Sequence, residues 1–270
     1  MSRLLLLALM ISTVQAATPL TVIDGYAFVR VTVNGQPFRM LLDTGHSSCA
    51  LAPEAAQRAG LAYNHRVVVD TKAGSRTVPA ASAHIAVADQ IFDAEILAQS
   101  IEGVRKVDPK ADGVLGQSFL DRLPYLIDYR NKRLLLGAEA DERAATLGAP
   151  ISAEQVEGRL VLPVILTDGG HPWRLALDSG SRHLLVECGS GCPRLAEHIG
   201  VGRILTNFGE CHAEQGYLRR AQVGDITIAR PEVLLIESVA QPGREDGLLP
   251  TRILSAVYVD AGHKQVRLAR

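Results

Sequence analysis

The sequence predicts a mostly antiparallel β protein made of two similar halves, each with one short helix. Three observations lead to this fold class. A nine-residue segment at 37–45 recurs 135 positions later, at 172–180. Short β-branched runs such as 28–33 alternate apolar and polar residues, which is typical of half-buried strands. Turn-forming residues separate these runs about every ten positions, and Asn34-Gly35 is a hairpin signal.

The N-terminal segment has the three-part layout of a secretory signal: Arg3, an apolar run over 4–14, and small residues up to Ala17. The run is about half of the ~20 apolar residues that span a bilayer. We therefore expect a signal peptide over 1–16, cleaved after Ala16 or Ala17. The mature protein would be exported, periplasmic or secreted, and would have no membrane span.

The repeat extends beyond the nine-residue segment. A helical stretch over 53–59, begun by a Pro and closed by Gly60, has a counterpart over 193–199 closed by Gly200. An Asp-Gly-apolar-apolar motif at 112–115 returns at 246–249, and each half ends in a strand-like run, at 126–136 and 257–268. We expect a first lobe over 17–137, a linker over 138–150 and a second lobe over 151–270.

Four cysteines, Cys49, Cys188, Cys192 and Cys211, would lie in an oxidising compartment, where disulfides persist. Three full pairings are possible and the sequence does not choose among them. Cys188, Cys192, Cys211 and His212 could alternatively bind zinc, but their spacing fits no standard zinc pattern. We expect no metal, and at least one disulfide that involves Cys188 or Cys192.

The overall charge excludes one class of partner. The chain has 28 basic and 29 acidic residues, no basic block and no aromatic-basic interleaving, so nucleic acid is not an expected partner.

The repeated acid is the candidate for chemistry. Asp43 and Asp178 each end an apolar run, where burial of a carboxylate is costly unless the group is hydrogen-bonded or shifts its pKa. If the halves pack about a pseudo-twofold axis, the two carboxylates meet there, share one proton, and can activate a water molecule. Gly45 and Gly180 would permit tight loops, and the hydroxyls of Thr44 and Ser179 could bond across to the other half.

These motifs resemble the pepsin and retropepsin superfamily of aspartic peptidases. Residues 41–45 are similar to the family's active-site motif, and residues 114–120, which contain Gly116, are similar to the apolar-apolar-Gly motif behind its catalytic loop. The resemblance covers nearly all of 20–270, as two retropepsin-sized repeats. It implies an all-β fold of the acid-protease type, with two pseudo-twofold-related closed β-barrel lobes, a cleft between them and extended peptide substrates. It also implies direct attack by water, with no metal and no cofactor.

The chain departs from the family at three places. Ser179 replaces the usual Thr but keeps the hydroxyl. Pro250 stands where the second apolar-apolar-Gly motif has Gly, which puts the support of Asp178 in question because Pro fixes φ and lacks an N–H. His46 follows the first triplet and, if protonated near the pair, would modulate its pKa. By position, the flap over the cleft would lie between 67 and 79, with its turn at Ala73-Gly74.

The expected function is therefore an aspartic endopeptidase that acts on peptides or proteins as a monomer, with its two lobes paired within one chain. A non-catalytic peptide-binding module is the alternative, which Pro250 favours. Hydrolysis of a glycosidic bond would also use two acids, but at ~5–9.5 Å, which is wider than a pair sharing a proton.

Overall fold

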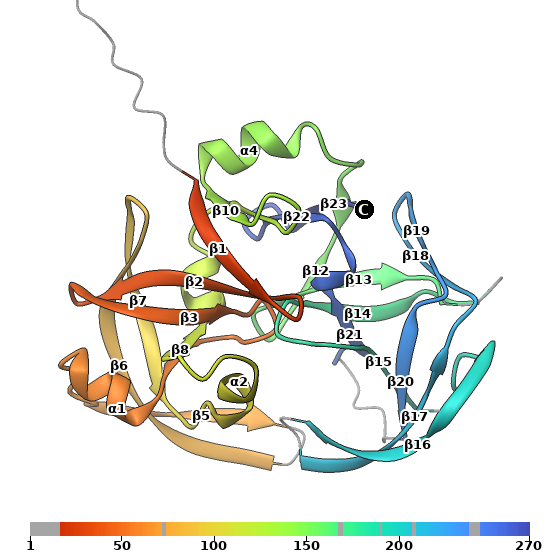
Figure 1. Cartoon of the computed structure of the whole chain (residues 1–270), viewed down its shortest axis with the longest axis horizontal. Coiled ribbons are helices and arrows are strands. Elements are labelled where there is room, and N and C mark those ends of the chain that lie inside the picture. The colour runs from red at the N-terminus through yellow and green to blue at the C-terminus, as the bar shows by residue number, and fades with distance from the viewer. Residues whose placement is uncertain (1–16, 72–73, 167–169, 190, 207–208, 238–243) are drawn as a thin grey trace, which may run out of the picture.

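The computed structural model describes residues 17–270 apart from 72–73, 167–169, 190, 207–208 and 238–243, so the expected signal segment over 1–16 lies outside the described residues. The chain is mostly β, as predicted, with two main sheets. In Figure 1 the red to yellow strands of the first half lie to one side and the green to blue strands of the second half mainly to the other. Side chains from both halves share one hydrophobic core, to which Phe28, Leu42 and Leu177 contribute. No helix of the described residues is long and apolar enough to cross a membrane.

The strand that leads to Asp43 lies inside the sheet of the first half. The hairpin signal is confirmed, because Asn34 and Gly35 have φ values of 48° and 80° and join two antiparallel strands. Seven strands follow one another in space in the order β2 (Tyr26–Val33), β3 (Gln36–Leu42), β8 (Gly113–Leu115), β4 (Cys49–Leu51), β7 (Gln90–Ala98), β6 (Gly74–Val87) and β5 (His65–Thr71). The β3–β8 pair is parallel, and it carries Asp43 at the end of a buried strand.

The second half repeats this order strand for strand. Its sheet begins with β12 (Glu154–Val156) and continues as β13 (Arg159–Val164), β14 (Trp173–Asp178), β21 (Gly247–Pro250), β15 (Leu184–Cys188), β20 (Glu232–Glu237), β17 (Gly209–Tyr217) and β16 (Glu197–Thr206). The β14–β21 pair is parallel, like β3–β8. Since a repeat in sequence is also a repeat in strand topology, the second half is built on the same plan as the first.

The closure of each half differs. In the first half β2 also pairs with β6, through Thr32↔Ala86 and Val33↔Ile85. In the second half the hairpin of β18 (Arg220–Val223) and β19 (Ile226–Ala229) forms a separate small sheet, and the bridge Ile165↔Gln222 connects it to the chain that follows β13. These pairings do not establish a closed barrel for each half, so the barrels expected from the resemblance are not confirmed.

Strands from both ends of the chain extend the first sheet. They are β1 (Thr18–Ile23), β10 (Arg133–Leu136), β9 (Tyr125–Asp128), β22 (Ala256–Asp260), β23 (Gln265–Ala269) and β11 (Ile151–Ser152). Each closing run predicted as strand-like is in fact a hairpin, and β9 pairs with β22. The C-terminal strands thus join the sheet of the first half. The lobe boundaries stay a prediction.

The prediction of one short helix per half is wrong for both halves: the first half has three short helices, and the described residues of the second half have none apart from a 3-10 turn. The first half has α1 (Pro53–Arg58), where a helix was expected, together with α2 (Glu102–Val107) and α3 (Gln117–Leu120). The expected linker contains α4 (Ala138–Ala144), and a 3-10 turn, η1 (Thr251–Ile253), follows β21. Residues 193–199 form no helix: Ala196 N donates to Tyr217 O (2.8 Å), and the chain from Glu197 onward pairs with β17 as β16. Gly200, expected as a helix stop, lies at an irregularity in that strand pair.

Candidate active site

The two catalytic candidates occupy equivalent positions. Asp43 directly follows β3, where its N–H donates to Leu115 O of the parallel strand β8 (3.0 Å). Asp178 is the last residue of β14 and lies opposite Pro250 of the parallel strand β21. Both strands are apolar and buried, so each carboxylate is delivered at the end of a rigid element rather than on a long loop.

The glycine of each loop lies against the aspartate of the opposite loop. A Cβ atom added to Gly45 would be 2.5 Å from Cγ of Asp178, and one added to Gly180 would be 2.5 Å from Cγ of Asp43. Real Cβ atoms do not approach that closely, so only glycine fits at either position. The two loops therefore meet reciprocally, with Asp43 and Asp178 side by side, as the repeat predicts.

The hydroxyls of Thr44 and Ser179 hold the loops together. Thr44 Oγ1 donates to Leu177 O (2.8 Å) and accepts from Ser179 N (3.0 Å). Ser179 Oγ donates to Leu42 O (2.7 Å) and accepts from Thr44 N (2.9 Å). Thr44 and Ser179 are 0% and 1% exposed, so these four bonds are shielded from water. They are the bonds expected across the halves, and the Ser makes the same pair as the Thr.

The surroundings of Asp43 and Asp178 raise the pKa of both carboxyl groups. Asp43 Oδ1 accepts from Gly45 N (2.9 Å), and Asp178 Oδ1 accepts from Gly180 N (2.8 Å). Burial raises the pKa of Asp43 above its usual range, although the Gly45 bond opposes this. Burial also raises the pKa of Asp178, and the adjacent charge of Asp43 raises it further. Asp178 is only 8% exposed whereas Asp43 is partly exposed, so the shared proton belongs on Asp178.

His46 lies beside this pair in an environment that favours the neutral ring. His46 Nδ1 lies 2.6 Å from the carbonyl oxygen of Ser48, so Nδ1 carries the proton and donates it. The side-chain amide nitrogen of Gln99 lies 2.9 Å from His46 Nε2 and donates to it, so Nε2 is unprotonated. Burial lowers the pKa of His46. Protonation would cost it the Gln99 bond, so the cationic form that would modulate the dyad is disfavoured; the modulating role stays a prediction.

The segments behind the two loops differ. A Cβ on Gly116 would lie 2.6 Å from His46 O, so glycine is needed there, and the Gln117 side-chain amide donates to Thr44 O (2.9 Å). Pro250 has φ of −70°, which its ring imposes anyway, and it continues β21 in extended form. The hydroxyl of Thr251, the next residue, bonds to Tyr129. Pro250 is therefore accommodated, and it does not disturb the pairing of Asp178 with β21.

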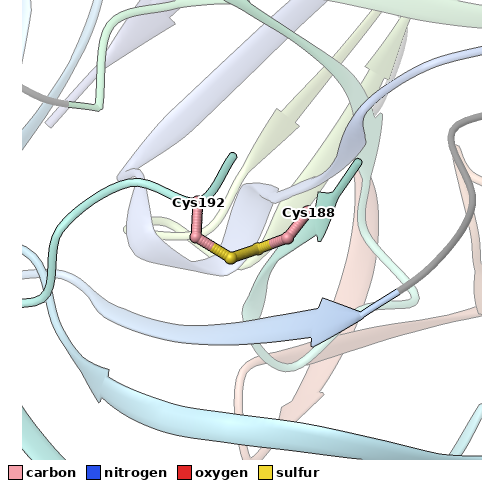
Figure 2. Close-up of a disulfide and its surroundings, with 2 residues drawn as sticks. All are labelled: Cys188 and Cys192. Atoms are coloured by element: carbon pink, nitrogen blue, oxygen red, sulfur yellow. A yellow bond between two sulfur atoms is a disulfide. The ribbon is translucent and has the colours of Figure 1, made fainter. Parts of the chain in front are cut away.

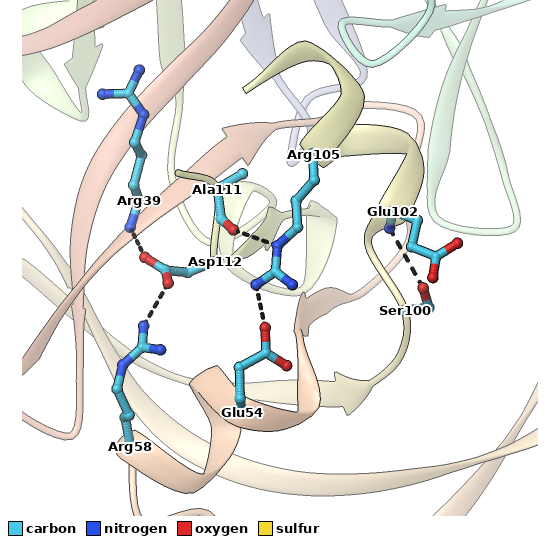
Figure 3. Close-up of polar contacts among 8 residues, drawn as sticks. All are labelled: Arg39, Glu54, Arg58, Ser100, Glu102, Arg105, Ala111 and Asp112. Atoms are coloured by element: carbon cyan, nitrogen blue, oxygen red, sulfur yellow. Dashed lines mark hydrogen bonds and ion pairs between the residues drawn. The ribbon is translucent and has the colours of Figure 1, made fainter. Parts of the chain in front are cut away.

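Asp112 and Asp246, the acids of the repeated Asp-Gly-apolar-apolar motif, have a structural role. Asp112 Oδ2 accepts from Arg39 N (2.9 Å), and its other oxygen accepts from Arg58 (2.5 Å), as Figure 3 shows. Asp246 Oδ2 accepts from Arg174 N (2.8 Å) in the same way. The hydrogen bond of Asp112 therefore connects the chain that enters β8 to β3, and that of Asp246 connects the chain that enters β21 to β14.

Two residues near the dyad were missed by the sequence analysis. Tyr26 and Arg159 begin the strands that precede the two catalytic strands, directly after the hairpin glycines Gly25 and Gly158. Burial raises the pKa of Tyr26, and the charges of Asp178 and Asp43 add to that rise. The charge of Arg159 opposes the rise in the pKa of both acids. Arg159 forms a two-pronged pair with buried Glu245, at 2.9 Å for both contacts. The glycine before each residue is the signal that could have located them.

The flap expectation falls on a hairpin. β5 and β6 pair through Thr71↔Gly74, and Gly74 begins β6, while Ala73 lies outside the described residues. The second half has an equivalent hairpin of β16 and β17, which pair through Thr206↔Gly209, 135 positions after the Thr71↔Gly74 pair. This second hairpin was not predicted, because a helix was expected over 193–199.

The expected disulfide is present. Cys188 and Cys192 are bonded, with their Cα atoms 4.8 Å apart (Figure 2). The bridge removes two thiolates from the alternative zinc set, which argues against that reading of the cysteines. Cys49 is a buried free thiol.

The comparisons with known proteins bear on the first half. Residues 29–122 match the family model described as gag-polyprotein putative aspartyl protease. This segment is a retropepsin-like aspartyl protease domain. The matched span contains Asp43, Thr44, Gly45 and Gly116 of the aspartyl protease domain, but it does not extend to the second repeat. A search among curated proteins found no match to this chain.

Proposed function

We propose that the chain is an aspartic endopeptidase that hydrolyses peptide bonds with water activated between Asp43 and Asp178. One observation carries this proposal: Gly45 and Gly180 each lie against the acid of the other loop, which brings the two carboxylates together. The family match of residues 29–122 supports it for the first half, and the identical strand order supports a duplicated lobe for the second. In this proposal each half is a closed barrel lobe and peptides bind as extended strands between them.

The ionisation states assign the chemical roles. Water held between the acids gives a proton to ionised Asp43 while its oxygen attacks the scissile carbonyl carbon, and Asp178 gives its proton to the carbonyl oxygen. The resulting diol collapses as the C–N bond breaks. Asp43 then returns its proton to the leaving nitrogen, and a diol hydroxyl gives one back to Asp178. Both acids end in their starting states, with no covalent intermediate.

The alternative of a non-catalytic binding module rested on Pro250. Since Pro250 adopts the φ that its ring imposes and keeps its place in β21, the structure gives that alternative no support. The close approach of the loops also argues against a glycosidase, whose acids are ~5–9.5 Å apart.

We propose further that the mature protein works outside the cytoplasm, and that the hairpin at 65–87 acts as a flap. The Cys188–Cys192 bond supports export, because disulfides persist in oxidising compartments. Mass spectrometry of the exported protein should find this bond and an N-terminus near residue 17; full-length protein retained in the cell would contradict export.

The test of the proposed function is digestion of a mixed peptide library by the purified mature protein over a pH series, with and without pepstatin. We expect internal cleavage with a bell-shaped pH dependence, blocked by pepstatin. Asp43→Asn and Asp178→Asn should each abolish cleavage without unfolding the protein, because Asn keeps the shape and relieves the repulsion. Wild-type rates in either variant would refute the assignment.

A further inference from the structure

The proposed active site is asymmetric in charge. Two arginines of the second half, Arg182 and Arg252, occupy positions where the first half has Ser47 and Ser118, at offsets that follow the repeat. Ser118 is fully used within its own half, because its Oγ accepts from Cys49 N (2.9 Å) and donates to Glu95 O (3.1 Å). The side of the site next to Asp178 is thus cationic, whereas the equivalent side next to Asp43 has neutral serines.

Arg182 is placed to meet a substrate. It lies four residues after Asp178 on the same loop, and its side chain is exposed. Within the part of the chain that the structure describes, it makes no hydrogen bond or ion pair. Burial raises the pKa of Tyr26, the charge of Arg182 opposes that rise, and the charges of Asp178 and Asp43 add to it, so Arg182 and the dyad both act electrostatically on this phenol.

Arg252 strengthens the positive potential at that place. Its guanidinium lies over the Tyr26 ring, with Cζ 5.8 Å from the ring centroid, and packs below the Gly25 turn. Its Nη1 is buried with no hydrogen-bond partner among the described residues. A buried cationic donor without an acceptor is costly, and among the described residues no ion pair joins Arg252 to a carboxylate.

The nearby acids already have partners. Glu245 is paired with Arg159, and Glu157 with Arg159 and Arg244. Glu232 accepts from Gln215 (2.5 Å) and lies 3.5 Å from His183. Arg182 is an exposed cation on the same loop as Asp178, and the acids among the described residues do not form an ion pair with it.

We propose that this site, if it is the peptidase proposed above, selects substrates with a carboxylate on the part of the peptide that passes over the second catalytic loop, and that Arg182 binds this carboxylate. A guanidinium binds a carboxylate through paired, charge-assisted hydrogen bonds, which Gln in the substrate cannot replace. The carboxylate belongs either to an Asp or Glu side chain or to a free C-terminus close to the scissile bond.

The experiment uses a peptide that the mature protein cleaves, taken from the library digest. Glu and Gln versions are made at each of three positions on either side of the scissile bond, each with a free or an amidated C-terminus. The Glu/Gln ratio of kcat/KM is measured for the wild type, Arg182→Gln and Arg182→Glu. Arg30→Gln, which removes an exposed cation from β2, is the control for net charge.

At one position the wild type and Arg30→Gln should prefer Glu by about tenfold, as expected for one charge-assisted bond. The ratio should fall to about one in Arg182→Gln, and in Arg182→Glu it should fall below one, because two carboxylates repel each other. If amidation rather than Glu/Gln exchange changes the rate, and Arg182→Gln abolishes that effect, the carboxylate is the C-terminus. A wild-type ratio of one at every position with no effect of amidation, or a preference that survives in Arg182→Gln, overturns the proposal. Those outcomes leave the peptidase assignment intact, since that depends on whether Asp43→Asn abolishes cleavage.

Discussion

The two catalytic loops agree where they touch each other and differ where they touch the rest of the protein. Both have a glycine against the opposite acid, a buried hydroxyl that makes two bonds across, and an N–H two residues on that donates to the acid. Behind the loops, Gly116 and Gln117 in one half correspond to Pro250 and Thr251 in the other. At the edges, serines on one side correspond to arginines on the other.

This difference indicates which contacts must keep the same geometry for the proposed chemistry. Contacts at the loop interface fix the separation of the carboxylates, and a small displacement there costs much rate. The support behind each loop only has to hold the strand end in place, which can be done with different residues. The edge determines what binds, and it is free to become asymmetric.

The largest effect should come from the interface glycines. Gly45→Ala and Gly180→Ala would each place a methyl group 2.5 Å from the opposite carboxyl carbon and push the acids apart. We expect kcat/KM for a cleaved peptide to fall by about 100-fold or more in either variant. Gly103→Ala is the matched control, because a Cβ there meets nothing within 4 Å. An active Gly45→Ala variant would mean that the acids need not lie this close.

A smaller effect, which differs between the halves, should come from the residues behind the two loops, Gly116 and Pro250. Gly116→Ala would bring a methyl group 2.6 Å from His46 O, so we expect a clear loss of both activity and thermal stability. Pro250→Gly relieves no strain, since φ is already −70°, and should leave activity unchanged while costing about 0.4–1 kcal/mol through backbone entropy. Peptide cleavage and thermal unfolding measure both. A large loss of activity in Pro250→Gly would show that the ring itself is required.

The smallest effect on activity should come from the disulfide, which occurs only in the second half and lies at the position where the first half has α1. The loop from Cys188 to Cys192 is short, so the bridge contributes about 2 kcal/mol, and replacing both cysteines by Ser should lower the unfolding temperature by about 4–8 °C. Peptide cleavage under the same conditions should be unchanged. An unfolded variant would show that the bridge is needed to form β16.

The sequence predicted the parts of this structure that the repeat encodes. The Asp-Thr/Ser-Gly triplets, the hairpin at Asn34-Gly35 and helix α1 have local signals, and the repeat was enough to infer that Asp43 and Asp178 meet. The second helix failed because 193–199 has helix-like end residues, while pairing of β16 with β17, a tertiary contact, decides its conformation. Pro250 looked disruptive because only the backbone shows that its required φ is the native one. Tyr26 was not predicted because its place near the dyad depends on the pairing of β2 with β3, which the sequence shows only as a hairpin signal.

The most direct test of the central claim, two adjacent carboxylates that share a proton, is the pH dependence of thermal stability. The native pKa of Asp178 is raised, so between its ordinary value of about 4 and the raised value the native state binds more protons than the unfolded state, and stability falls as pH rises. Asp178→Asn lacks this loss. We predict that its unfolding temperature matches that of the wild type at about pH 4 and exceeds it by about 2–5 °C at about pH 8. A difference that stays constant across this range would show that Asp178 titrates normally, and would contradict the account.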